Sequence, residues 1–251
     1  MKAYTYLPFF YFQQTRLNNK KALFFHGVYE WIPVIILALY SSPMYGTVVE
    51  LLLYYLAFIS VYELGYLLND QLAHGEENAR KRTDRLPKSR IALFVVIRLI
   101  VFLSITFFQG HMSAPLWWAW YSILILQFAL HNFVKFPSLN VITFSTLAFI
   151  RFFSPIIVLI PPSLIVTLAL PVFLNYVLFR LFIYMDSKEM LKNFDRHTNG
   201  YRIGYYLVLF GLSALISFIL NSWMPLAFNL YFFFAALIFA ASTLFKGKLS
   251  V

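Results

Sequence analysis

The sequence predicts an all-helical integral membrane protein with about eight transmembrane helices. Of its 251 residues, 61% are hydrophobic and only 12% are charged, which is far more apolar than a soluble domain of this length. The apolar residues gather in stretches long enough to cross a bilayer, for which a helix needs about 20 residues. The expected spans are residues 22–41, 47–68, 91–109, 115–134, 138–159, 163–184, 203–220 and 224–245.

The connections between these spans differ in charge, and this difference predicts the topology. Four short connections, SSPMYG, GHMSA, IPPS and NSW, carry no charged residue, whereas residues 1–21, 69–90 and 185–202 are rich in Lys and Arg. The positive-inside rule therefore places both termini and the long charged loops in the cytoplasm. The net charge of +10 then needs no nucleic-acid partner and favours contact with anionic lipid.

Prolines refine the later spans, and the spacing of the long loops predicts an internal repeat. Pro155, Pro161 and Pro162 are expected to kink or end the span at 138–159, and Pro171 to bend the next one. A long charged loop follows the second and the sixth span. We therefore expect a single transmembrane domain, residues 1–251, built from pseudo-repeats of about 22–134 and 138–245.

The first charged junction, after the second span, combines acids with fixed positive charge. If the helix continues past Asn69, then Asn69, Asp70 and Glu77 can approach one face. Mg²⁺ prefers such oxygen ligands together with substrate phosphates. Arg82 and Arg85 would neutralise the remaining phosphate charge. The alternative is a solvated basic loop with incidental acids.

The second charged junction repeats this mixture after the sixth span. Asp186 and Glu189 are spaced i and i+3, so the end of a helix would place them side by side. Asp195 is a further candidate metal ligand, and Lys188 a candidate partner for phosphate. The alternative is an amphipathic cytoplasmic loop.

Five ionisable residues lie inside the predicted spans, where charge is costly, so each should face a polar cavity or a partner. They are Glu30, Glu63, Arg98, Arg151 and Arg180. The alternative is structural ion pairing, for example of Glu63 with Arg180 or Arg151. The five histidines show no ligand spacing, and the absence of cysteine excludes disulfides and thiolate metal sites.

These residues resemble the UbiA superfamily of intramembrane prenyltransferases. Its first signature has the form N-D-x-x-D-x-x-x-D followed by an R-T-x-x-R-P-like stretch; here Asn69-Asp70 match its start, Ala73 replaces the middle acid, and Glu77 takes the last acidic place. Arg82-Thr83 and Arg85-Leu86 follow at nearly the same spacing. The stretch HNFVKFPSLNVITFSTLAFIR is similar to the passage between the fourth and fifth helices, with Lys135, Asn140 and Arg151. The likeness covers roughly residues 60–205, although the second acidic cluster departs from the standard spacing.

The resemblance implies a UbiA-like fold and a Mg²⁺-dependent transfer of an isoprenyl group from a prenyl diphosphate to an aromatic or other hydrophobic acceptor. Asp70 and Asp186 would be catalytic, and the metal ligands would be Asn69, Asp70, Glu77, Asp186, Glu189 and Asp195. The diphosphate would meet Arg82, Arg85, Lys135, Arg151 and Lys188, and the substrate Tyr62, Tyr66, Asn140, Arg180 and Tyr184.

Two alternatives remain open at this point. One is a polyprenyl-phosphate phosphoribosyltransferase of the same superfamily, with which the polar run ENARKRTDR is compatible. The other is a transporter or non-catalytic binding protein on the same fold. Ala73 and the loosely matched second motif favour this alternative. In each case we expect a multi-pass protein of a bacterial or archaeal cell membrane.

Overall fold

A computed structural model describes residues 3–42, 46–75, 83–84, 86–134, 136–191 and 199–248 of the chain. Throughout these residues the secondary structure is helical, with turns between the helices and no strand. The chain divides into two compact units. Unit 1 comprises residues 1–30 and 34–160, and unit 2 comprises residues 31–33 and 161–251.

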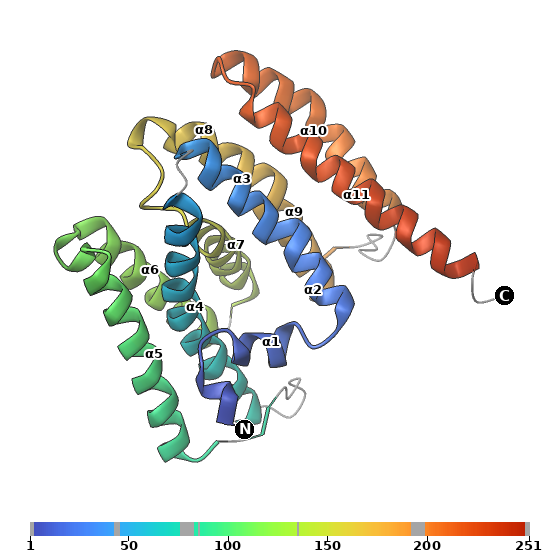
Figure 1. The fold of residues 1–251 in the computed structure, drawn as a ribbon. Helices are drawn as coiled ribbons and strands as arrows, with labels where there is room; N and C mark the ends of the chain where they lie inside the picture. The colour runs from blue at the N-terminus through green and yellow to red at the C-terminus, as the bar shows by residue number, and fades with distance from the viewer. Residues whose placement is uncertain are drawn as a thin grey trace. The chain divides into compact units, whose positions relative to one another are not determined.

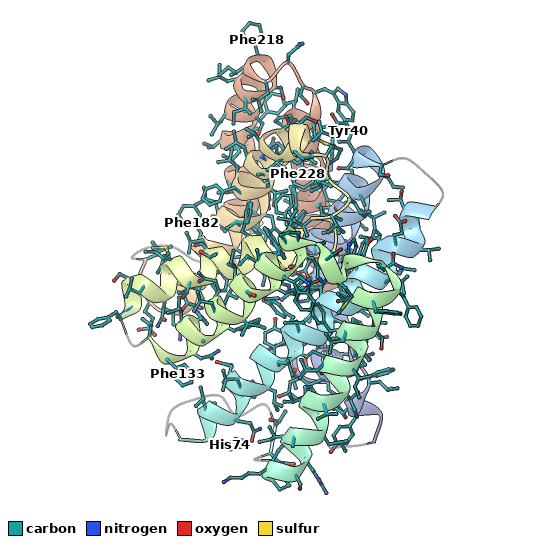
Figure 2. The ribbon with its side chains drawn as sticks, turned by 90° about the vertical axis from the view of Figure 1, so that its left-hand side faces the viewer. Tyr40, His74, Phe133, Phe182, Phe218 and Phe228 are labelled. Atoms are coloured by element: carbon teal, nitrogen blue, oxygen red, sulfur yellow. The ribbon has the colours of Figure 1, made fainter. Side chains whose placement is uncertain are left out.

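Six of the described helices are long and apolar enough to cross a membrane. They cover Ala22–Ser41, Thr47–Leu72, Lys88–Phe108, Pro162–Ser187, Gly200–Ile219 and Met224–Ala241. Large apolar side chains on their surfaces are exposed, for example Phe218 near the C-terminal end of its helix, labelled in Figure 2, which is 85% exposed. Apolar exposure on this scale is typical of surfaces that face lipid. The chain is therefore an all-helical, multi-pass membrane protein.

The predicted spans at 115–134 and 138–159 are helical but are not among these six. The first is α6 (Pro115–Phe133), and the second is α7 (Pro137–Phe153), which has only 17 residues. α7 ends at Phe153, earlier than expected: Ser154 still has helical dihedrals, with φ of −51° and ψ of −41°, but Pro155 lacks the N–H that would continue the hydrogen-bond ladder. The division into units falls after Ile160, not between the two predicted pseudo-repeats, and the repeat stays a prediction.

Unit 1 is built around a long helix, α4, on which α1, α5 and α6 pack, while α7 packs on α6 (Figure 1). Apart from residues 31–33, its elements are η1 (Ala3–Tyr6), α1 (Phe10–Arg16), α2 (Lys20–His26), the π-helix η2 (Gly27–Trp31), α3 (Ile32–Ser41), α4 (Gly46–Leu72), η3 (Ala73–Gly75), α5 (Lys88–Phe108), η4 (His111–Ser113), α6 and α7. Proline begins both α6 and α7, where its missing N–H costs nothing. The side chain of Asn19 caps α2 by accepting a bond from the Ala22 N–H.

Unit 2 contains η5 (Pro162–Leu164), α8 (Ile165–Val172), the π-helix η6 (Phe173–Leu178), α9 (Phe179–Ser187) and the pair α10 (Asn199–Ile219) and α11 (Met224–Lys248). The orange and red helices of Figure 1 show α10 and α11 side by side. The π-helical stretch follows Pro171, which lies inside α8 and disturbs its hydrogen-bond ladder. The bend expected at this proline stays a prediction.

Polar side chains join the helices of unit 2. The side-chain amide of Asn229 donates to the side-chain Oδ1 of Asn175 at 2.9 Å, and the Tyr206 hydroxyl donates to the backbone carbonyl of Asn175 at 3.1 Å. All three residues are fully buried. Such interhelical bonds hold helices together where the hydrophobic effect is weak.

Candidate functional site

The first feature of the site is a stripe on α4 formed by Tyr62, Tyr66 and Asp70, which are four residues apart and so lie on one face. The α-helix continues three residues past Asn69, to Leu72, which is less than one turn. Asp70 is only 1% exposed, whereas its neighbour Asn69 is exposed. The two residues that open the motif therefore do not share one environment.

Asp70 is held by the N-terminal segment, residues 3–17. Arg16 donates from Nη2 to Oδ1 at 2.8 Å and from Nη1 to Oδ2 at 3.2 Å, and the Tyr11 hydroxyl donates to Oδ2 at 2.7 Å. A two-pronged guanidinium contact of this kind is strong and directional. The Arg16 guanidinium also lies 4.3 Å from the centre of the Tyr66 ring.

Tyr11 is a stable hydrogen-bond donor in this arrangement. Burial raises the pKa of its phenol well above the ordinary value, and the negative charge of Asp70 raises it further. The phenol therefore stays protonated, and Asp70 keeps its second donor at any pH that the protein meets.

A second set of contacts in the site is centred on Arg151 of α7. Its Nε donates to Glu30 Oε1 at 2.8 Å, and its Nη1 donates to the Tyr66 hydroxyl at 2.7 Å. The centre of its guanidinium lies 5.2 Å from the Tyr62 ring and 5.1 Å from the Phe12 ring. Tyr62 and Tyr66, predicted for the substrate, are thus in direct contact with Arg151, predicted for the diphosphate.

A third arginine fixes the N-terminal segment from α5. Arg98 pairs with Glu63 at 2.6 Å and donates to the backbone carbonyls of Thr5, Tyr6 and Leu7. Glu63 in turn accepts the Phe12 N–H at 2.7 Å. The structural ion pair expected for Glu63 is present, but its partner is Arg98 and not Arg151 or Arg180.

We call these groups the arginine–carboxylate cluster: the pairs Arg16–Asp70, Arg98–Glu63 and Arg151–Glu30. Within the described part of unit 1 the N-terminal segment touches all three pairs, because the Phe12 ring also lies 5.1 Å from the Arg151 guanidinium. Sequence reasoning missed Arg16, Tyr11 and Phe12. They lie outside the apolar spans, and a contact across more than 50 residues leaves no local pattern.

The fit of a divalent cation to Asp70 is poor in this arrangement. Both carboxylate oxygens already accept bonds from Arg16 and Tyr11, so a metal ion would have to displace a guanidinium. Among the described residues, no group of three or more His, Asp or Glu side chains is placed to hold a metal ion. Five predicted site residues lie outside the described residues: Glu77, Arg82, Arg85, Lys135 and Asp195.

Asn140 lies in the first turn of α7 and is half-buried. It precedes Arg151 by about three turns of helix, which puts both residues on nearly the same face. The described structure shows no contact of the Asn140 side chain with Arg151.

The second junction lies at the end of α9 in unit 2. The helix ends at Ser187, and Glu189 has a left-handed backbone with φ of 58°. Asp186 and Glu189 therefore do not lie side by side on a helix end, as their spacing had suggested. Lys188 is exposed, Tyr184 is half-buried on α9, and the Arg180 guanidinium lies 5.4 Å from the Tyr176 ring.

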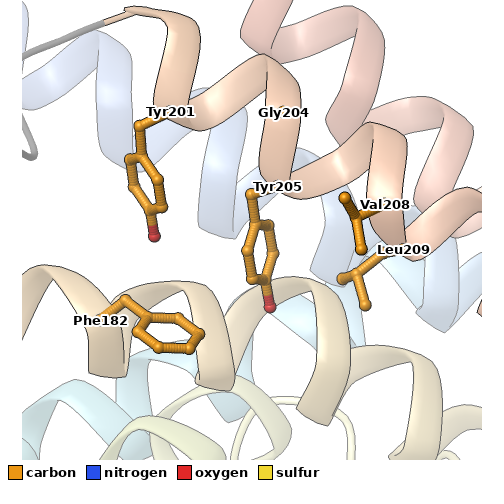
Figure 3. Close-up of a pocket in the computed structure, with 6 residues that line it drawn as sticks. All are labelled: Phe182, Tyr201, Gly204, Tyr205, Val208 and Leu209. Atoms are coloured by element: carbon orange, nitrogen blue, oxygen red, sulfur yellow. The ribbon is translucent and has the colours of Figure 1, made fainter. Parts of the chain in front are cut away.

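An apolar pocket of about 270 Å³ lies beside this part of unit 2. Figure 3 shows Tyr201 and Tyr205 extending from α10 toward Phe182 of α9, and Gly204, Val208 and Leu209 complete the lining. The Tyr205 hydroxyl donates to the Leu174 backbone carbonyl. Its hydroxyl is thus satisfied by the helix, and the ring presents an apolar face to the pocket.

Comparison of the chain with protein-family models, with curated proteins and with solved structures gave no match.

Proposed function

We propose that this protein is an intramembrane prenyltransferase of the UbiA type, which moves an isoprenyl group from a prenyl diphosphate to an aromatic or other hydrophobic acceptor. One observation carries the proposal: Arg151 donates to Tyr66 at 2.7 Å while its guanidinium lies 5.2 Å from the Tyr62 ring. A fixed cation and electron-rich ring faces thus meet inside an apolar helical unit. This reaction needs both, because it releases an anion and forms an allyl cation.

The residues of the site have separate roles in this proposal. Arg151 is suited to bind the oxygens of the diphosphate. Glu30 fixes the position of the guanidinium, because its Oε1 accepts a hydrogen bond from Arg151 Nε at 2.8 Å. The rings of Tyr62, Tyr66 and Phe128 contact one another edge to face and offer faces that stabilise a cation. Burial keeps water away from the allyl cation, which water would otherwise capture.

Magnesium remains a prediction of the resemblance. Such an ion supplies Lewis-acid stabilisation of a leaving diphosphate. The described residues around Asp70 do not fit a magnesium ion while Arg16 is paired with this carboxylate. We therefore assign roles to Arg151 and to the aromatic rings, and assign no step of the reaction to a metal ion.

The proposal includes the finer topology suggested by the sequence. We propose that α6 and α7 complete the six long helices to eight spans, with both termini and the charged loops in the cytoplasm of a bacterium or archaeon. Support comes from the polar ends of these two helices and from the charge difference between the connections. Labelling of single introduced cysteines in the natively cysteine-free chain would test it, since each connection must react from only one side.

The decisive experiment is a product screen by mass spectrometry. Purified protein in lipid is incubated with prenyl diphosphates of several lengths and mixed hydrophobic acceptors, or with phosphoribosyl diphosphate and a polyprenyl phosphate, with Mg²⁺ and with EDTA. We expect a prenylated acceptor, and a loss of about 100-fold or more for Arg151→Gln, because an electrostatic contact to the leaving group is removed. Arg90→Gln, an exposed arginine on α5, is the matched control. No prenylated product from any donor would refute the proposal.

A second function is favoured by one observation, the Arg16–Asp70 pair. The carboxylate that starts the UbiA-like motif is neutralised by the protein's own guanidinium. A binding or transport protein on this fold needs no metal at that carboxylate. Metal-independent binding of a prenyl diphosphate without turnover would support this second function.

A further inference from the structure

His26 lies between two charged groups of the arginine–carboxylate cluster. Its Nδ1 is 3.2 Å from Glu30 Oε2, one helical turn away, and 3.2 Å from Arg151 Nη2. The side chains of His26, Glu30 and Arg151 are 12%, 3% and 5% exposed. The proposed function assigns Glu30 only as an anchor for Arg151 and gives His26 no role.

The two contacts of Nδ1 require different protonation states. A contact with Glu30 is favourable when Nδ1 carries a proton, because a carboxylate only accepts. A contact with Arg151 is favourable when Nδ1 carries none, because a guanidinium only donates. A single nitrogen placed at equal distance from both partners is therefore suited to gain and lose a proton in place.

The surroundings of His26 are consistent with such a site. The π-helix η2 begins immediately after His26 and carries Glu30, and π-helical turns occur frequently at functional sites. The charged groups in contact with the imidazole include Glu30 on η2 and Arg151 on α7, and Arg151 in turn donates to the Tyr66 hydroxyl on α4. The ring of Phe12 packs edge-on against the imidazole with centres 5.4 Å apart.

We propose that His26 and Glu30 form a proton-accepting pair, in which His26 takes the proton that an aromatic acceptor loses during prenyl transfer and Glu30 stabilises the resulting imidazolium. The proposal rests on the proposed function for the source of the proton. Arg151 places this pair beside the position assigned to the diphosphate, so the acceptor ring and the proton acceptor meet at the same point of unit 1.

The step balances as follows. The carbon–oxygen bond of the prenyl diphosphate breaks, and its electron pair leaves with the diphosphate. A ring carbon of the acceptor bonds to the allylic carbon, and the ring becomes a cation. The C–H electron pair then returns to the ring, while the proton passes to Nδ1 of His26 and forms an imidazolium beside the Glu30 carboxylate.

The test compares His26→Gln, His26→Asn and Glu30→Gln with His131→Gln, which removes a histidine of unit 1 that contacts Thr143 at 2.9 Å. Product formation is measured across about pH 5 to pH 8, the range in which histidine titrates. Acceptor deuterated at the reacting carbon is compared with unlabelled acceptor. Infrared difference spectra of the purified protein in lipid follow carboxylate and imidazole protonation over the same range without any substrate.

For both His26 variants we expect product formation to fall about 100-fold, as is typical for loss of a general base. Their rates should lose the pH dependence of the unchanged protein and become sensitive to deuteration of the acceptor, since proton removal is then slow. A purely structural role would change neither the pH profile nor the isotope effect. His131→Gln should resemble the unchanged protein.

The failure of this proposal and of the proposed function are distinguishable. If no donor gives product, but the infrared spectra show a proton shared by imidazole and carboxylate that disappears in His26→Gln and Glu30→Gln, the proton site stands without the transferase. If the variants make product with an unchanged pH profile and no isotope effect, the proposal is overturned. The absence of any such infrared signal also overturns it.

Discussion

The pairing of Arg16 with Asp70 predicts a large and unequal loss of stability when either residue is replaced. Breaking a buried ion pair by removing one partner costs about 3–5 kcal/mol, because the other charge stays buried. In Arg16→Gln the carboxylate of Asp70, which is 1% exposed, keeps only the Tyr11 hydroxyl. In Asp70→Asn the Arg16 side chain, which is 10% exposed, has a long stem and can turn its charge toward water.

We therefore expect Arg16→Gln to be the more damaging substitution. For a chain of this size each kcal/mol lowers the melting temperature by about 2–4 °C, so the expected fall is on the order of 10 °C. Asp70→Asn should cost less, and the double variant should resemble Asp70→Asn because no charge remains unpaired. The non-additivity in this cycle measures the coupling of the pair.

The assay is thermal unfolding of the purified protein in a mild detergent, followed by loss of monodisperse protein. Arg90→Gln removes an exposed arginine of the same unit and is the control. A melting temperature of Arg16→Gln equal to that of Arg90→Gln would refute the reasoning, because it would show that Asp70 does not depend on Arg16.

Three further predictions concern other parts of the fold. Gly65→Ala places a methyl group against the Phe128 ring, so we expect a loss of about 1–3 kcal/mol, while Gly204→Ala, whose methyl group meets open space, should be nearly neutral in the same melting assay. Asn229→Leu removes the donor to a buried amide of η6 and should cost about 1 kcal/mol in denaturant unfolding. Burial lowers the pKa of His111, so the folded state holds this proton less tightly than the unfolded state; stability should fall as the pH drops below about 6.5, and His111→Gln should lose this dependence.

The membrane-spanning helices could be predicted from the sequence because length and hydropathy are local properties. α4 extends only a few residues beyond its expected end and carries Tyr62, Tyr66 and Asp70 on one face, as periodicity requires. The early end of α7 was foreseeable from Pro155. α7 is not among the six long helices because of its length: it is apolar but has only 17 residues.

The partners of the buried charges could not be predicted in the same way. The sequence indicated that Glu63 and Arg151 needed partners, but helix packing decides which charges meet. Glu63 meets Arg98, and Arg151 meets Glu30, across 35 and 121 residues. The role of Arg16 had no local signal, since a basic residue before a first span is equally explained by topology.

The contacts of the N-terminal segment also set an order for biosynthesis. The carbonyls of Thr5 and Leu7 are bound by Arg98, which follows them by 93 and 91 residues. At about 5–20 residues per second, the ribosome makes Arg98 roughly 5–20 s after these carbonyls. This segment must therefore wait for α4 and α5 to be inserted before it can dock, and a fusion partner placed directly before residue 3 would compete with this late docking.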